Sequence, residues 1–164
     1  MVLTALVSIY VFFKPLHIKQ QKFGDVPLFE LSDFTMYELN KKGLDTIMTG
    51  STATRYSNRY KVDNINYTDN RDAYVANMKA DRGVYKNDIV TLNGNVEYKR
   101  DDGLTFETQK ATYNKKSSDI ISKVGYVAYL NDSIVRGTYI KYNNKKDIIF
   151  SKNVVAKIQL QESK

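Results

Sequence analysis

The chain has 164 residues, a formal net charge of +7 and an isoelectric point near 9.4. It has no Cys, which excludes disulfides and thiolate metal sites, and a single His, which excludes sites built from several imidazoles. Basic residues alternate with acidic and polar ones, and no zinc-finger, helix-turn-helix or RNP-type motif occurs, so we expect no nucleic-acid partner. The length is typical of one domain, and the abundance of Val, Ile, Thr, Tyr and Phe predicts an all-β fold.

Residues 1–18 begin with an uncharged apolar run, MVLTALVSIYVFF. As a helix this run is about 20 Å long, short of the ~30 Å hydrocarbon core, but continuation to Ile18 gives a marginal span with Lys14 at the interface. We predict a single N-terminal transmembrane helix that anchors the chain. The first alternative is a signal peptide, which would be imperfect because neither a basic start nor an Ala-x-Ala cleavage site is present. The second alternative is a buried amphipathic segment. Lys14, Lys19 and Lys22 alone would place the following domain in the cytoplasm.

Residues 19–27 form a polar connector, and residues 28–164 are expected to form one β-domain. The first strand, 28–39, is expected to kink near Ser32-Asp33. Alternating apolar residues and turn signals then predict further strands at 44–50, 54–62, 64–68, 73–80, 84–92, 120–130, 134–142 and 148–160.

The clearest hairpin covers residues 90–113. Apolar residues alternate from Val90 to Tyr98, and Asp102-Gly103 supplies the positive φ of a tight turn before the alternation resumes. Phe106 is even-numbered and Ala111 is odd-numbered, so the apolar face changes register between them. This shift predicts a β-bulge near Gln109-Lys110.

Four tyrosines, Tyr56, Tyr85, Tyr113 and Tyr142, are separated by 29, 28 and 29 residues. This spacing favours an internal repeat of the hairpin. The alternative is a tyrosine-rich β-domain without internal symmetry.

The last predicted strand, 148–160, is long for a strand at the end of a chain. A free strand edge is an aggregation hazard unless something pairs with it. We therefore predict that a partner strand adds there, using the apolar residues of one face: Ile148, Phe150, Val154, Ala156, Ile158 and Leu160.

Catalytic groups are hard to assemble from this sequence. His17 lies at the end of the apolar run and is expected at the membrane interface, and no Gly-rich phosphate loop or acidic metal loop occurs. Asp101 and Asp102 are interpreted as turn formers. We expect a binding protein, with no enzymatic activity, cofactor or metal.

Several short motifs follow the N-terminal apolar segment: Leu92-Asn93-Gly94-Asn95-Val96, Asp102-Gly103-x-x-Phe106-x-Thr108, Ala111-x-Tyr113, Ile121-Ser122-x-Val124 and Gly137-x-x-Ile140-x-Tyr142. With these motifs the chain resembles the lipopolysaccharide-export bridge proteins, and among them the LptC family more than the soluble LptA type. The resemblance implies an open, twisted β-jellyroll in the periplasm, attached to the inner membrane by one span. It implies that lipopolysaccharide is received from an ABC transporter complex of the LptB, LptF and LptG type. The lipid would then pass to an LptA-type jellyroll through the C-terminal edge strand.

A jellyroll of this kind would shelter acyl chains between its layers, each buried CH2 contributing about 0.8 kcal/mol. The alternative is a tethered structural or interaction β-domain whose layers close on one another. Basic residues at the rim would meet lipid phosphates, although the sequence does not indicate which ones. The candidate lipid-lining residues are Tyr56, Tyr60, Met78, Leu92, Val96, Tyr98, Phe106, Tyr126 and Phe150.

Overall fold

The computed structural model describes residues 26–41, 43–71 and 73–159, and this part of the chain is entirely β-structure and turns. The predicted anchor, residues 1–18, lies outside the described residues. Within them, no helix is long and apolar enough to cross a membrane. The strands are β1 (Phe29–Asn40), β2 (Gly43–Arg55), β3 (Tyr60–Asp69), β4 (Ala76–Lys86), β5 (Ile89–Arg100), β6 (Leu104–Asn114), β7 (Asp119–Ser122), β8 (Tyr126–Leu130), β9 (Ser133–Gly137), β10 (Tyr139–Asn143), β11 (Ile148–Lys152) and β12 (Val155–Lys157).

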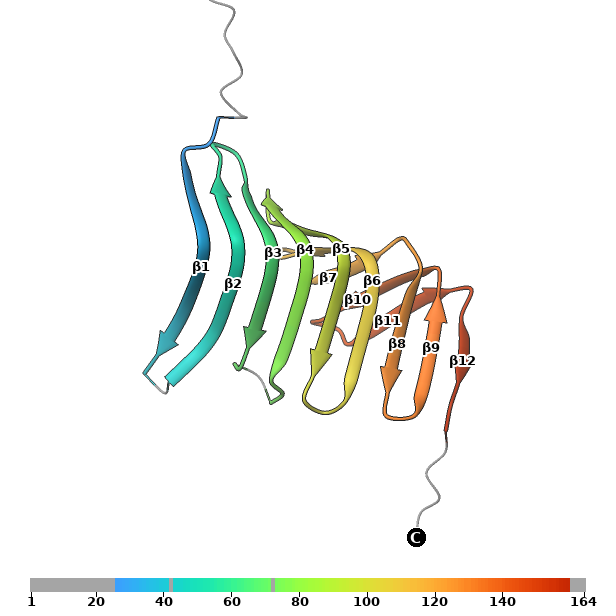
Figure 1. Cartoon of the computed structure of the whole chain (residues 1–164). Helices are drawn as coiled ribbons and strands as arrows, with labels where there is room; N and C mark the ends of the chain where they lie inside the picture. Colours follow the sequence, from blue (N-terminus) through green and yellow to red (C-terminus); the bar gives the residue numbers. More distant parts are fainter. Residues whose placement is uncertain (1–25, 42, 72, 160–164) are drawn as a thin grey trace, which may run out of the picture.

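All pairings are antiparallel, and β1 to β6 follow one another as neighbours in one sheet. The sheet then divides. The first half of β6 pairs with β8, and β8 continues through β9 to β12. The second half of β6 pairs with β7, which continues through β10 to β11. Figure 1 shows β7, β10 and β11 behind β6, β8 and β9. We call the two halves the front arm, which ends in β8, β9 and β12, and the back arm, which ends in β7, β10 and β11. The confirmed part of the fold prediction is therefore an open, all-β antiparallel sheet.

The strands change direction along a line between the arms, which we call the crease. Left-handed backbone marks it in several strands, with φ of 48° at Asp33, 51° at Asn64, and 74° and 44° at Gly94 and Asn95. Asn and Asp tolerate this conformation better than other side chains do, because they form local hydrogen bonds. The pairing of β5 with β6 shifts register between Asn93 and Val96. This shift confirms the irregularity predicted opposite Gln109-Lys110, and the φ of Asp33 confirms the kink predicted in β1.

Small residues and short hydrogen bonds hold the crease together. A Cβ on Gly94 would lie 2.3 Å from Asp81 Oδ2, so the close approach of β4 and β5 requires glycine. Asn95 Nδ2 donates to the same oxygen at 3.0 Å. Thr108 Oγ1 lies 3.0 Å from Ser122 Oγ and donates to the Gly125 carbonyl, also at 3.0 Å. The polar groups at the bend are thus satisfied locally, as buried polar groups must be.

The Asp102-Gly103 turn forms as predicted, with φ of 95° at Gly103. Five strand predictions are wrong. Three of them each span two elements, since 84–92 covers the turn between β4 and β5, 120–130 is divided into β7 and β8, and 134–142 is divided into β9 and β10.

The other two wrong strand predictions are 54–62 and 148–160. The strand predicted over 54–62 is instead the end of β2, the start of β3 and a turn between them, closed by a hydrogen bond from Tyr56 N to Arg59 O at 2.8 Å. The single strand predicted over 148–160 is divided by Asn153, whose left-handed φ of 51° separates β11 in the back arm from β12 in the front arm. Both errors come from alternating apolar residues that continue through a turn or bend.

Candidate functional site

The buried core of this sheet is thin. The buried hydrophobic residues among those described are Ile65, Ala80, Val96, Ala111 and Tyr126. The first four form one cluster at the crease. Most large apolar side chains on either side of it are only half-buried. A closed sandwich of this length would bury many Leu, Ile and Phe side chains completely. The two arms therefore do not pack tightly on one another.

A continuous row of mostly apolar side chains crosses the front arm on the side that faces the core. Residues paired across antiparallel strands point to the same face, so the row follows directly from the register. We call it the front row, and its members are Met36, Met48, Tyr67, Met78, Tyr98, Phe106, Ala128, Val135 and Ala156. From Met48 to Val135 these residues are half-buried.

A second row crosses the back arm in the same way. We call it the back row, and its members are Phe29, Arg55, Tyr60, Tyr85, Val90, Tyr113, Ile120, Tyr142 and Ile149. Three of the four regularly spaced tyrosines lie in it. The first, Tyr56, lies in the turn after β2, and Tyr60 occupies the row instead. The spacing therefore reports a real repeat of hairpins over β4 to β10, but not over the first strands.

The two rows lie on the inner faces of the bent sheet. Tyr126 of β8 reaches across to Ser151 of β11, and their hydroxyl oxygens are 2.8 Å apart. Ser151 Oγ also donates to the Tyr139 carbonyl at 2.7 Å, so the Tyr126 hydroxyl is the donor to Ser151. This bond joins the arms next to the crease. We call the two rows, together with the inner faces that carry them, the trough.

Partial burial raises the pKa of several tyrosines in the two rows. Burial raises the pKa of Tyr98 and of Tyr67 in the front row. Burial also raises the pKa of Tyr142 in the back row, helped by its hydrogen bond to Asp147, while the charge of Arg100 on the front arm acts in the opposite direction.

The structure brings together seven of the nine residues predicted to line a lipid slot. Met78, Tyr98 and Phe106 belong to the front row, Tyr60 belongs to the back row, and Val96, Tyr126 and Leu92 lie at or beside the core. The other two lie elsewhere. The ring of Tyr56 is covered by Arg59 at 3.9 Å in the turn after β2. Phe150 pairs with Lys141 and points to the outer face of the back arm.

Other trough residues were not predicted from the sequence. Val90 shares the alternating apolar face of Val96 and Tyr98 in the sequence but was not proposed as a lining residue. Back-row members such as Tyr85 and Ile120 come from strand positions whose face follows only from the register. The three-residue step from Thr108 to Ala111 was the one signal in the sequence that could have located the crease.

The predicted partner-strand residues lie along one edge of the bent sheet. Ile148 and Phe150 are on β11 and Ala156 is on β12, while Val154 and Ile158 flank β12, and Leu160 is outside the described residues. Four of them are strongly exposed large hydrophobic residues, at 48–68%, namely Ile148, Phe150, Val154 and Ile158. The opposite edge of the sheet is β1, which pairs only with β2 among the described strands.

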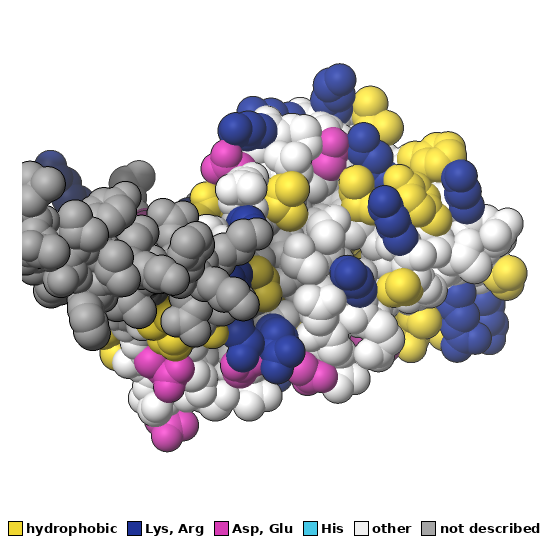
Figure 2. Space-filling view, turned by 90° about the horizontal axis from the view of Figure 1, so that it is seen from above, with side chains coloured by type: hydrophobic (Ala, Val, Ile, Leu, Met, Phe, Trp, Pro, Cys, Tyr) yellow, Lys and Arg dark blue, Asp and Glu magenta, His cyan; other side chains and the backbone are white. Residues whose placement is uncertain are grey.

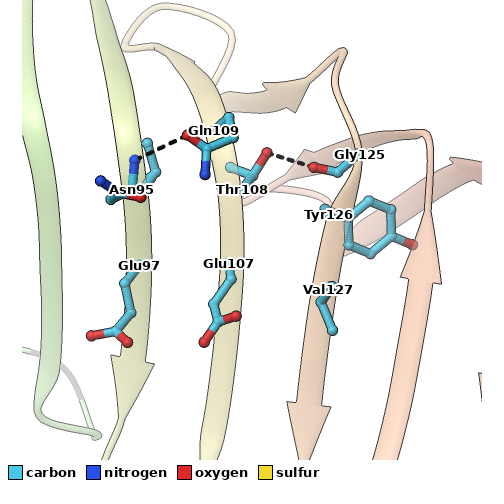
Figure 3. Close-up of a pocket in the computed structure, with 9 residues that line it drawn as sticks. Asn95, Glu97, Glu107, Thr108, Gln109, Gly125, Tyr126 and Val127 are labelled. Carbon is cyan, nitrogen blue, oxygen red and sulfur yellow. Dashed lines mark hydrogen bonds between the residues drawn. The ribbon is translucent and has the colours of Figure 1, made fainter.

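The outer face is different in character. A hollow of about 370 Å³ lies on the outer side of the crease, where Glu97, Glu107 and Val127 stand side by side on neighbouring strands (Figure 3). Its lining mixes polar groups with the apolar side chains of Val96, Tyr126 and Val127. No group of three or more potential metal ligands occurs among the described residues. From above, Lys and Arg side chains are scattered among hydrophobic and polar ones (Figure 2). The outer face also carries exposed apolar side chains, such as Ile148 and Phe150 on β11, but they stand among charged and polar ones.

The chain was compared with known protein families and solved structures. Residues 1–159 match the family model described as lipopolysaccharide-assembly, LptC-related. The chain belongs to this LptC-related family. A solved structure described as LptH, the LptA-homologous periplasmic component of the lipopolysaccharide transport device of Pseudomonas aeruginosa, is similar to this LptC-related chain. It has 11% sequence identity and a TM-score of 0.45, over 84% of this chain and 99% of the other. No curated protein sequence matches the chain.

Proposed function

We propose that this LptC-related chain carries lipopolysaccharide in the periplasm by sheltering its acyl chains in the trough between the front and back rows. The observation that supports this most directly is the pair of apolar rows that remain half-exposed on facing arms. Leaving so much apolar surface uncovered costs stability, and an acyl chain recovers about 0.8 kcal/mol for each CH2 that it buries. An amphiphile with long tails fits such a trough better than a compact ligand does.

Adjacent positions on β6 provide a matched test. Phe106 is in the front row, whereas its neighbour Glu107 is exposed on the outer face. A photo-crosslinking amino acid at 106 should capture lipopolysaccharide in cells, and the same amino acid at 107 should not. Equal capture at both positions would contradict the trough, as would the absence of capture at 106 in a folded protein.

The same proposal includes delivery to a following LptA-type jellyroll. The exposed edge formed by β11 and β12 is suitable for strand addition, because backbone groups at a free edge can pair with another strand. Addition of a strand there would also extend the two rows into the next molecule. In this way the acyl chains would remain covered during transfer.

A truncation after Asn153 tests delivery without dismantling the trough. It removes β12 but keeps β11 and the Tyr126–Ser151 bond. We expect the shortened chain to lose capture of the LptA-type partner while crosslinking at position 106 still captures lipid. Undiminished partner capture would exclude the β12 edge as the docking strand.

We also propose that residues 1–18 anchor the chain in the inner membrane, next to an ABC transporter of the LptB, LptF and LptG type that supplies the lipid. The apolar run supports the anchor. Membership of the LptC-related family favours a periplasmic β-domain, whereas the positive-inside rule applied to Lys14, Lys19 and Lys22 favours the opposite orientation. Protease added to spheroplasts should degrade the β-domain, and the protein should fractionate with the inner membrane. Protection from protease would contradict the periplasmic location.

A further inference from the structure

We propose that a basic lip at the free end of the back arm binds the phosphate groups of the amphiphile whose tails occupy the trough. This inference rests on the proposed function and deepens it. The lip consists of Lys115 and Lys116, in the turn between β6 and β7, together with Lys145 and Lys146, in the turn between β10 and β11.

Hydrogen bonds hold these turns together as one surface. Asn144 N donates to the Ser118 carbonyl at 2.9 Å, and Asn143 Nδ2 donates to the Ser117 carbonyl, also at 2.9 Å. Lys115 N donates to the Asp88 carbonyl at 2.8 Å, which ties the turn between β4 and β5 to the same group. The four lysines are therefore presented by a connected frame.

The lip adjoins the trough. Lys115 Nζ lies 4.6 Å from the centre of the Tyr85 ring, and Tyr85 belongs to the back row. The Tyr142 hydroxyl, from the same row, donates to Asp147 at 3.1 Å in the turn that carries the other two lysines. From the crease at Lys110 to the end of β6 at Asn114 is four residues, or about 13 Å of strand. A phosphate at the lip could thus belong to a molecule whose tails lie between the arms.

The charge of the lip is only partly neutralised. Lys116 Nζ lies 3.1 Å from Asp88 Oδ2. Lys145 and Lys146 have no ion-pair partner among the described residues. The turns at the free end of the front arm are mixed in charge, since they carry Asp101, Asp102 and Asp132 together with Lys41 and Arg71, and Asp102 is paired with Arg100. The positive charge of the lip is complementary to phosphate, and lysine is a common phosphate ligand in proteins.

The test uses the full chain and two amphiphiles, a bisphosphorylated acylated disaccharide of the lipid A type and its fully dephosphorylated form. The lip variant replaces Lys115, Lys116, Lys145 and Lys146 with Gln. A control variant removes the same amount of charge from exposed outer positions, with Gln at Lys79, Lys110, Lys123 and Arg136. We expect the lip variant to bind the phosphorylated amphiphile on the order of tenfold more weakly, and the control to bind like the wild type.

Binding of the dephosphorylated amphiphile should be equal in all three proteins. Equal weakening in the lip and control variants would show a non-specific effect of net charge and would overturn the proposal. Unchanged affinity of the lip variant would also overturn it, while leaving the trough intact. If the wild type bound neither amphiphile, the proposed function itself would fail. Vesicles containing phosphatidylglycerol provide the last arm, because a defect of the lip variant confined to vesicles would identify a membrane-docking surface and exclude the proposed ligand.

Discussion

The crease and the arms of this sheet differ in how completely their apolar side chains are buried. At the crease, small and medium-sized residues pack closely, and Val96 is only 3% exposed. On the arms, larger residues such as Met78 and Tyr98 remain half-exposed although they lie on the same strands. A conventional β-sandwich would place its largest side chains at the centre. Here the buried hydrophobic cluster lies at the crease, and the arms leave much of their apolar surface exposed.

The largest expected effect is on the free energy of unfolding, when the same substitution to Asn is made at the crease and on an arm. Val96→Asn places an amide in the buried core and should lower the free energy of unfolding by about 3 kcal/mol. Met36→Asn, at the front-row position on β1, should lower it by less than about 1 kcal/mol, because this side chain is 52% exposed. Chemical denaturation measures both. Similar losses for the two variants would remove the distinction between crease and arm.

Gly137 tests how tightly the crease is packed. A Cβ there would lie 2.6 Å from Tyr126 Cε1, and the ring is held by its bond to Ser151. Gly137→Ala should therefore lower the unfolding free energy by about 2 kcal/mol. Gly125→Ala is the matched control, since its nearest neighbour would be an ordinary contact at 3.9 Å. A tolerated Ala at 137 would show that the Tyr126 ring can move.

The bond between the arms is expected to contribute less. Tyr126→Phe removes the hydroxyl that donates to Ser151 and should cost about 1 kcal/mol. Combining it with Ser151→Ala in a double-mutant cycle isolates the pair, because Ser151 has a second bond to the Tyr139 carbonyl. A coupling energy near zero would mean that the arms do not depend on this bond for their spacing.

The smallest effect concerns pH at the free end of the front arm. Hydrogen bonding to Arg71 lowers the pKa of Asp69 below its ordinary value of 3.8. This carboxylate therefore stabilises the fold above that value, and the contribution is lost as the pH falls through the lowered pKa. Between about pH 5 and pH 2.5, Asp69→Asn should show a shallower loss of unfolding free energy than the wild type. Identical slopes for Asp69→Asn and the wild type would contradict the role of Asp69.

The sequence alone determined the fold class, the β5–β6 hairpin and the position of the irregularity opposite Gln109-Lys110. These are local properties, because alternation, an Asp-Gly turn and a change in parity are all read over a few residues. The same local rules failed at residues 54–62, 84–92, 120–130, 134–142 and 148–160, where the apolar pattern continued through a turn or a bend.

Only the tertiary structure decided which side chains face the trough. The face of each strand depends on its register and on the left-handed residues at the crease, and a shift of one position reverses every side chain. Met78 and Phe106 lie on the inner face, as the alternation of apolar residues predicted. Phe150 was predicted to lie there too, but the register of β11 with β10 places it on the outer face. The pairing of turns that gathers Lys115 and Lys146 into one lip is likewise non-local, because these residues are neighbours only after β6, β7, β10 and β11 have assembled.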